Sequence, residues 1–253
     1  MHNIAPESTN NYMGEESINR IAQTSITNHF EETVTQTMLK LIHPFTMIVN
    51  GPTQSGKTVF VLKMIDNMEN MIEPTPKKIM YCYKEYQPAK FDRYANTGRV
   101  TFFKGLPDSM DMFDGKHPTL LIIDDLMEQM NQTLSEIFTV GSHHRDLSVV
   151  FLTQNMFPKN KHARTISLNA HYLVFYKNPR DTTQFAVLAR QMYQSDYKFA
   201  LEGFQDATHE PHGYLLIDLK PQTDDRHRLR TRIFPGEQTF VWVDRKLYKP
   251  NGW

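Results

Sequence analysis

The sequence contains a single cysteine, Cys82, so the chain can form no internal disulfide and no multi-cysteine zinc site. One thiol fits a reducing compartment. Net charge is also absent, because 28 basic side chains balance 28 acidic ones. A global attraction to nucleic acid is therefore excluded, and any such binding must come from local patches. No apolar run reaches the roughly 18 residues that a bilayer requires, so we expect no membrane partner.

Two further signals are missing. The segment from Met1 to Tyr12 shows no basic stretch followed by an apolar one, so no secretory signal peptide is predicted. The 11 histidines show no spacing typical of a metal site. These absences indicate a soluble intracellular protein.

The sequence does contain enough apolar material for one sizeable domain, since 40% of its residues are apolar and 16 are phenylalanine. Residues 1–28 are polar and cannot bury enough surface to offset the entropy of ordering, so we expect a flexible arm there. Residues 29–220 are expected to form the core, beginning with a short amphipathic helix from Phe30 to Leu41. Residues 221–253 are expected to form a β-rich C-terminal appendage.

Strand-like and helix-like segments alternate through the core, which indicates a sheet flanked by helices. Strands are expected at 45–49, 79–83, 100–103, 120–123, 148–152, 172–175 and 214–219. Helices are expected at 59–71, 127–140, 182–193 and 196–204. Because the run at 120–123 is apolar throughout, the sheet is expected to be mainly parallel and covered on both faces. The predicted fold class is α/β.

One motif follows the first of these strands and opens the next helix. It consists of Gly51, Pro52, Thr53, Gln54, Ser55, Gly56, Lys57 and Thr58, the G-x-x-x-x-G-K-[ST] pattern of a phosphate-binding loop. Its glycines let backbone N–H groups point inward at phosphate oxygens, and the helix presents its positive end to the same anion. Lys57 is expected to reach the β- and γ-phosphates and Thr58 to ligate Mg²⁺. The expected ligands are ATP and Mg²⁺; the alternative is a glycine turn with an exposed lysine.

Two acids end the apolar strand at 120–123. Asp124 and Asp125 therefore lie at the carboxyl end of the sheet, where open α/β folds bind their ligands. Asp124 is expected to hold Mg²⁺, directly or through water, as the Walker B acid. Asp125 is then the candidate base that orients or deprotonates the attacking water, at a position where Glu is commoner. The alternative is that both acids begin the next helix as capping residues.

A third polar group, Gln154, follows the strand at 148–152. If this strand lies between the phosphate-loop strand and the Asp124 strand, Gln154 points at the γ-phosphate and can report its presence. A Gln at a strand end is otherwise a common turn residue. The order of loop, acid strand and polar-tipped strand favours an ASCE/RecA-like ring or motor ATPase over a GTPase switch or a small-molecule kinase.

The segments GPTQSGKT, LLIIDDL and VVFLTQN resemble those of the genome-packaging ATPases of the FtsK–HerA superfamily. The resemblance is greatest to the packaging ATPases of Maverick/Polinton-type elements, adintoviruses and related double-stranded DNA viruses, and the poxvirus packaging ATPase is more distant. The segments His43-Pro44-Phe45 and Gly141-Ser142-His143-His144-Arg145 add to it. It covers about residues 43–180.

This resemblance implies a homo-oligomeric ring, pentameric or hexameric, that hydrolyses ATP between subunits and threads double-stranded DNA into a preformed capsid. The implied partners are DNA, further copies of the chain and a capsid or portal protein, in the host nucleus or cytoplasm or in the virion. The family's trans-acting arginine finger lies shortly before the fourth core strand, which points to Arg145 as a catalytic residue, with Arg164 as the second candidate. The alternative for Arg145 is a surface cation at a helix end.

Basic clusters are the candidates for DNA contact. Four alternating arginines would share one face of a strand and could track phosphates: Arg226, Arg228, Arg230 and Arg232. An ordinary solvated strand or a subunit contact is the alternative, and the acids Asp224 and Asp225 favour it. Two smaller clusters lie at 143–145 and 159–164.

The leading functional hypothesis is an ATP-driven motor that translocates double-stranded DNA during genome packaging. A helicase or DNA-mobilising ATPase of the same superfamily is the second. The third is a nucleotide-gated assembly protein, in which ATP locks an oligomer and hydrolysis is incidental.

Overall fold

The computed structural model describes residues 40–129, 131–141 and 144–244. The arm expected at 1–28 lies outside these residues, as do nearly all of the helix expected from Phe30, His143 and the last part of the tail. Leu41 belongs to a short strand, β1 (Leu41–Ile42), which pairs in parallel with β3 (Ile72–Glu73).

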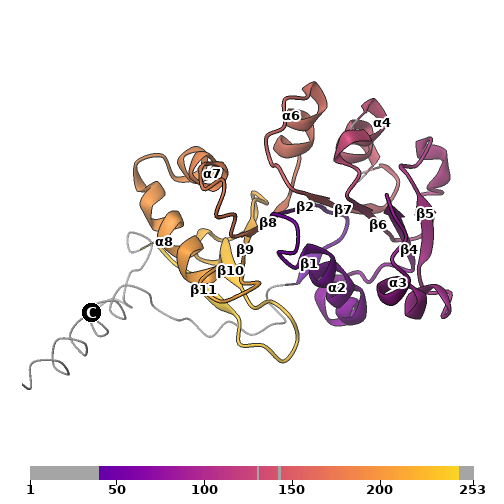
Figure 1. Cartoon of the computed structure of the whole chain (residues 1–253), viewed down its shortest axis with the longest axis horizontal. Helices are drawn as coiled ribbons and strands as arrows, with labels where there is room; N and C mark the ends of the chain where they lie inside the picture. Colours follow the sequence, from indigo (N-terminus) through magenta and orange to yellow (C-terminus); the bar gives the residue numbers. More distant parts are fainter. Residues whose placement is uncertain (1–39, 130, 142–143, 245–253) are drawn as a thin grey trace, which may run out of the picture. The chain divides into compact units, whose positions relative to one another are not determined.

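The other described strands form one nine-stranded sheet in the order β11-β10-β9-β8-β2-β7-β6-β4-β5 (Figure 1). Their bounds are β2 (Thr46–Asn50), β4 (Lys78–Tyr83), β5 (Thr101–Lys104), β6 (Thr119–Asp124), β7 (Leu147–Thr153), β8 (Tyr172–Tyr176), β9 (Tyr214–Asp218), β10 (Leu229–Thr231) and β11 (Phe240–Trp242). The neighbours from β8 to β5 run parallel, and β9, β10 and β11 are added antiparallel. The predicted α/β fold with a mainly parallel sheet is confirmed.

The strand β7 lies between β2 and β6. Its residue Leu152 pairs with Val49 on one side and with Asp124 on the other. The carboxyl ends of these three strands therefore meet at one edge of the sheet. This is the strand order on which the expected position of Gln154 depends.

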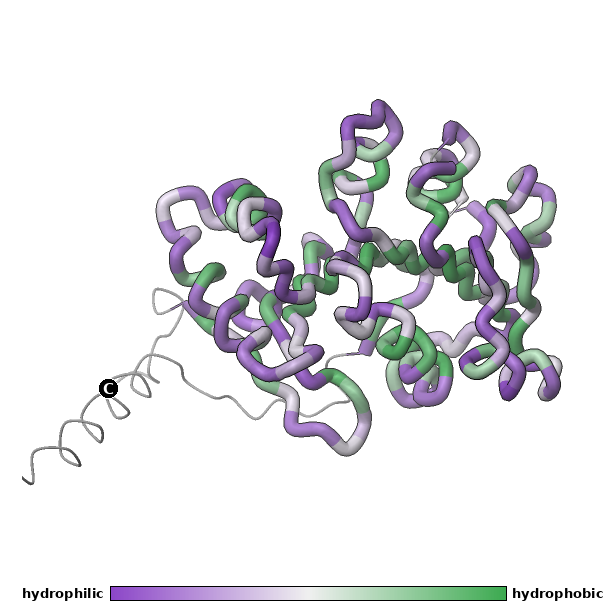
Figure 2. Tube along the Cα trace, viewed as in Figure 1, coloured by the Kyte–Doolittle hydropathy of each residue, from purple (hydrophilic) through white to green (hydrophobic). Residues whose placement is uncertain are grey.

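Helices cover both faces of the sheet (Figure 1). On one face lie α2 (Lys57–Met71) and α3 (Pro88–Ala95), and on the other α4 (Gln132–Glu136), α6 (Lys161–Leu168), α7 (Thr183–Tyr193) and α8 (Tyr197–Ala207). Successive strand side chains alternate between these two layers: Met47 and Val49 pack under α2, and Ile48 packs on the opposite face. Figure 2 shows the hydrophobic residues concentrated along the sheet between the layers. Burial on both faces explains why the strands are apolar throughout.

The single helix expected at 127–140 is interrupted. A 3₁₀ turn covers Met127–Gln129, α4 follows, and a π-helical turn covers Ile137–Gly141. The Asn131 side chain accepts a 3.0 Å hydrogen bond from the Leu134 N–H, and this cap starts α4 anew. The helix α3 was not expected from the sequence; Pro88 stands in its first turn, where proline is favoured.

The tail also differs from the separate appendage expected at 221–253. A hairpin of β10 and β11 does form, but β10 pairs with β9 and so extends the main sheet. Leu229 and Trp242 are buried in the same hydrophobic cluster as α7 and α8. Among the described residues, the tail up to 244 is thus the edge of the core, because its short apolar runs bury more surface on the sheet than they could alone.

Candidate functional site

The phosphate-binding loop joins β2 to α2 and is fixed to the neighbouring strand, since the Gly51 N–H donates to the Thr153 carbonyl at 3.1 Å. A Cβ at Gly51 would lie 2.7 Å from the Tyr176 Cβ and from Ser55 Oγ, so no larger residue fits. Gly56 has a φ of 108°, a left-handed conformation that L side chains rarely adopt. Close approach at one glycine and backbone conformation at the other explain the motif's spacing.

The side chain of Lys57 lies over this loop. Its Nζ donates to the Gly51 carbonyl at 2.6 Å and to the Pro52 carbonyl at 2.8 Å. Burial lowers the pKa of Lys57, whereas the nearby Asp124 and Asp125 raise it. The ammonium is therefore held at the mouth of the loop between backbone carbonyls and two carboxylates.

Thr58 and Asp124 approach each other directly, although 66 residues separate them in sequence. The Thr58 hydroxyl donates to Asp124 Oδ2 at 3.2 Å, and the Tyr81 hydroxyl donates to the same oxygen at 2.7 Å. Burial raises the pKa of Asp124, and the hydrogen bonds from Tyr81 and Thr58 act to lower it. Burial and the nearby Asp124 raise the pKa of Tyr81, so the phenol stays protonated and can donate.

Asp125, Gln154 and Thr53 form a chain of polar contacts at the opening of the site. Gln154 Nε2 donates to Asp125 Oδ1 at 3.4 Å, and the Thr53 hydroxyl donates to Gln154 Oε1 at 3.4 Å. All three side chains are exposed. Asp125 has a φ of 57°, a conformation that Asp tolerates better than most residues. The structure thus brings both acids, the glutamine and the loop into one place.

These residues line a cleft of about 730 Å³. One wall comes from the end of β4 and the segment after it, with Tyr83, Lys84, Gln87 and Lys90. The opposite wall comes from the C-terminal strands and their loops: Tyr176, His212, Tyr214, Phe234 and Glu237. The sequence did not predict a role for Tyr81 or for the residues of this second wall, because none of them belongs to a recognisable sequence motif.

No protein-family model matches the chain, and no curated protein sequence does. Among solved structures it is similar to the genome packaging NTPase B204 from Sulfolobus turreted icosahedral virus 2, determined in complex with ATP-gammaS. The two chains are 15% identical with a TM-score of 0.46, over 71% of this chain and 94% of that one. A likeness of this degree carries no function across to this chain.

Arg145 lies just before β7, whereas Gln154 follows the other end of that strand. Seven strand residues separate the two ends by roughly 20 Å, so Arg145 cannot reach the phosphate loop of its own chain. Its guanidinium donates to the Phe113 carbonyl at 3.2 Å and to Asp111 Oδ1 at 3.4 Å. Arg164 lies on α6, is exposed, and has no hydrogen-bond or ion-pair partner within the described ranges.

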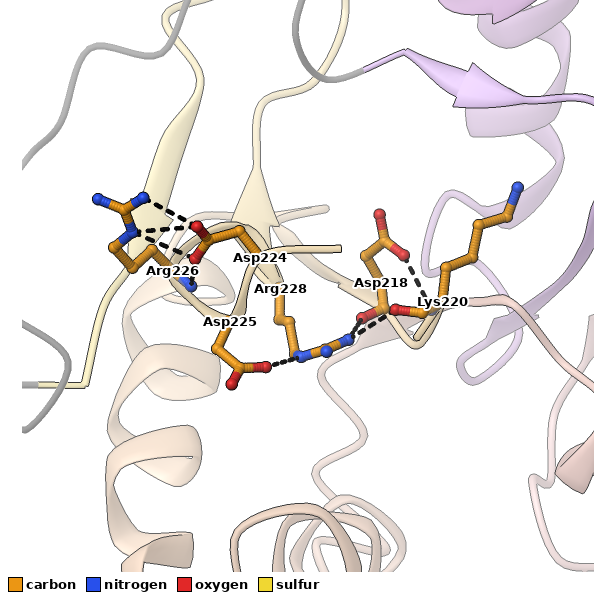
Figure 3. A network of polar contacts seen from close by, with 6 residues as sticks. All are labelled: Asp218, Lys220, Asp224, Asp225, Arg226 and Arg228. Carbon is orange, nitrogen blue, oxygen red and sulfur yellow. Dashed lines mark hydrogen bonds and ion pairs between the residues drawn. The ribbon is translucent and has the colours of Figure 1, made fainter. Parts of the chain in front are cut away.

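The four arginines of the tail do not share a strand face, which corrects that expectation. Only Arg230 lies in a strand, and it is buried in an ion pair with Asp218 at 2.7 Å. Figure 3 shows Arg226 paired with Asp224, while Arg228 contacts Asp225 and the backbone carbonyls of Asp218 and Lys220. The Arg232 guanidinium lies over the Phe240 ring. Acids and carbonyls within the fold bind three of these cations and an aromatic ring lies against the fourth, so they form no row for DNA phosphates.

In the part of the chain that the structure describes, no helix is long and apolar enough to cross a membrane. No group of three His, Cys, Asp or Glu side chains there could hold a metal ion by itself.

Proposed function

We propose that this chain is an ATPase whose hydrolysis drives double-stranded DNA into a viral capsid, as one subunit of a homo-oligomeric ring. The observation that carries the ATPase proposal is the meeting of Thr58 and Asp124, 3.2 Å apart, beside the Lys57 ammonium at the mouth of a glycine loop. A glycine turn with a merely exposed lysine would not bring a distant buried acid to the same point. The motor and packaging part rests on the sequence resemblance.

The donor set at this point suits Mg²⁺. A hydroxyl and a carboxylate oxygen are hard oxygen ligands, and Thr58 and Asp124 present them from two rigid elements. Mg²⁺ keeps several of its other positions for water and substrate phosphates, so two protein ligands suffice. When bound, the ion neutralises charge on the β- and γ-phosphate oxygens.

In the proposed reaction, backbone N–H groups of the loop and the Lys57 ammonium hold the β- and γ-phosphates. Asp125 accepts a proton from a water whose oxygen forms a bond to the γ-phosphorus. The bond from that phosphorus to the bridging oxygen breaks, and ADP and phosphate result. Gln154 donates to Asp125 and is positioned to pass the presence of the γ-phosphate to Thr53 and the loop.

The ring part of the proposal is supported by the place of Arg145. Because this residue lies at the opposite end of β7 from Gln154, any action on phosphate would be directed at the site of a neighbouring subunit. An arginine suits that role, since a planar, permanently charged group can stabilise charge on the transferred phosphoryl group.

The test measures ATP binding and turnover with and without duplex DNA. We expect Lys57→Ala to abolish ATP binding and Asp125→Asn to retain binding but lose DNA-stimulated turnover. Lys77→Ala, an exposed lysine before β4, is the matched control and should behave as the wild type. Undiminished ATP affinity in Lys57→Ala would overturn the proposal.

The same assay separates the alternatives. ATP-driven strand separation in place of duplex movement would identify a helicase. ATP-dependent oligomerisation with no DNA-stimulated turnover would identify an assembly protein.

A further inference from the structure

The cleft extends well past the phosphate loop along the outer side of α2. Val59, the residue after Thr58, is 61% exposed and lines it, which is unusual for an apolar side chain at the start of a buried helix. Lys63 lies one helical turn further on the same side. From Lys57 to Lys63 the helix rises about 9 Å, which is comparable to the reach of a nucleotide beyond its terminal phosphates.

The loop between β10 and β11 faces this side of α2, shown in yellow next to it in Figure 1. The Lys63 ammonium lies 4.4 Å from the centroid of the Phe234 ring and forms an ion pair with Glu237. Glu237 Oε2 also accepts a hydrogen bond from the Phe234 N–H at 3.3 Å. The Phe234 ring packs edge-on against the rings of Phe60 and Tyr214, with ring centroids 5.1 Å and 6.4 Å apart, and these contacts hold it in place.

Val59, Lys63 and Glu237 bound one lobe of the cleft, and His212, in the turn before β9, also lines the cleft. Its Nδ1 donates to the Ser55 carbonyl of the phosphate loop at 3.1 Å. A Cβ at Gly56 would lie 3.5 Å from that same nitrogen, so the imidazole lies directly against the loop. The wall that carries Phe234 and Glu237 is thus joined to the phosphate site by a direct contact.

We propose that this lobe, bounded by Val59, Lys63 and Glu237, binds the adenine base of the nucleotide. The inference rests on the function proposed above and adds to it the part that recognises the base. The exposed apolar side chain of Val59, with a carboxylate acceptor and an ammonium donor beside it, matches a purine, which has an apolar face and polar edge atoms. Glu237 accepts from the exocyclic amino group, and Lys63 donates to a ring nitrogen.

The state of Glu237 favours adenine over guanine. A carboxylate captures guanine through two parallel hydrogen bonds, one to each oxygen. Here one oxygen faces the Lys63 ammonium and the other holds the Phe234 N–H. A base that needs a single acceptor therefore fits this carboxylate better than one that needs both oxygens.

The experiment compares binding of ATP, GTP and inorganic tripolyphosphate by the full chain, using titration calorimetry. Tripolyphosphate reports on the loop alone, because it has no base. In Glu237→Ala we expect the Kd for ATP to rise about tenfold, the effect of losing one hydrogen bond to a charged group, while the Kd for tripolyphosphate stays within about twofold. The ratio of the Kd for GTP to the Kd for ATP should also fall in Glu237→Ala.

Two further variants keep the result interpretable. Lys63→Met retains the apolar stem and should weaken ATP but not tripolyphosphate. Glu73→Gln is the matched control, since Glu73 forms a comparable exposed ion pair with Lys40 outside the cleft. Its Kd values should equal those of the wild type.

The possible results separate a failure of the proposed function from a failure of this inference alone. A wild-type protein that binds neither ATP nor tripolyphosphate would overturn the proposed function and this inference with it. A wild type that binds both, with Glu237→Ala and Lys63→Met unchanged or weakening both ligands equally, would overturn the base lobe and leave the ATPase proposal standing.

Discussion

The Tyr81 hydroxyl and the Thr58 hydroxyl donate to the same carboxylate oxygen of Asp124, at 2.7 and 3.2 Å. Tyr81 lies on β4, next to the acid strand, and is completely buried. The buried carboxylate is therefore oriented from two sides, by the helix that begins at the phosphate loop and by the neighbouring strand. This arrangement makes Tyr81 a positioning residue for the proposed Mg²⁺ ligand.

Replacing Tyr81 with Phe removes one of the two donors. Because these hydrogen bonds act to lower the pKa of Asp124, that pKa should rise further in the variant. We expect kcat/KM to fall about tenfold and the acidic limb of its pH profile to move to higher pH. Tyr193→Phe, on α7 and away from the cleft, is the control. An unshifted pH profile in Tyr81→Phe would show that the phenol only fills space.

The charge on Asp124 should reduce stability when Mg²⁺ is absent. Burial raises its folded-state pKa, so the folded protein holds this proton more tightly than the unfolded chain does. The penalty is absent below the unfolded pKa of about 3.9, grows as the pH rises towards the folded pKa, and is complete above it. Asp124→Asn should therefore raise the melting temperature at neutral pH by about 3 °C, or roughly 1 kcal/mol, and lose this gain in acid.

Melting curves in chelator from pH 4 to 8 measure that difference. Asp114→Asn, an exposed acid whose pKa is lowered by the Lys78 ammonium, should show the opposite sign. An Asp124→Asn gain that does not change with pH would contradict the prediction.

Alanine substitutions at Gly56 and Gly98 distinguish the effect of backbone strain from the effect on ligand binding. Both have positive φ values, 108° and 66°, and a Cβ at Gly98 would meet nothing within 4 Å. Each Gly→Ala change should lower the free energy of unfolding by about 1 kcal/mol. Only Gly56→Ala should also lose ATP binding, because its backbone N–H belongs to the loop that is proposed to hold the phosphates. Equal ATP affinity in the two variants would place the phosphate site elsewhere.

Arg145 is expected to act across a subunit interface. Arg145→Ala subunits by themselves should show a kcat about 10³-fold lower than that of the wild type, and Asp125→Asn subunits by themselves should not turn over ATP. Mixed subunits should partly recover turnover, since some interfaces then combine an intact arginine with an intact base. Asp111→Asn loosens the contact that Arg145 makes within its own chain and should remain active. No recovery at any mixing ratio would count against the finger.

The pair of Arg230 and Asp218 should contribute to folding and not to DNA binding. Their side chains are 3% and 7% exposed, so Arg230→Ala leaves a buried charge without its partner and should cost about 3–5 kcal/mol. Arg226→Ala, which breaks an exposed pair with Asp224, should cost under about 1 kcal/mol. Denaturant unfolding measures both. A larger loss in Arg226→Ala than in Arg230→Ala would reverse this assignment.

Local chemistry was enough to predict the phosphate loop, the acid strand and the alternation of strands and helices. Gly56 has a backbone conformation that favours glycine, Gly51 lies close to Ser55 of the same loop, and the apolar run at 120–123 indicates a strand covered on both faces. Such features depend on neighbours in sequence, so a single chain suffices to find them.

Only the tertiary structure decided which distant residues complete the site. Tyr81, His212 and Glu237 belong to three separate parts of the fold, and their local sequence does not indicate that they lie near the phosphate loop. It also decided that Arg230 is buried while Arg226 is not, since strand pairing with β9, and not the alternation of arginines, sets which side chains face the core. The physical reason is that the position of a strand in a sheet depends on long-range pairing, which a local pattern does not contain.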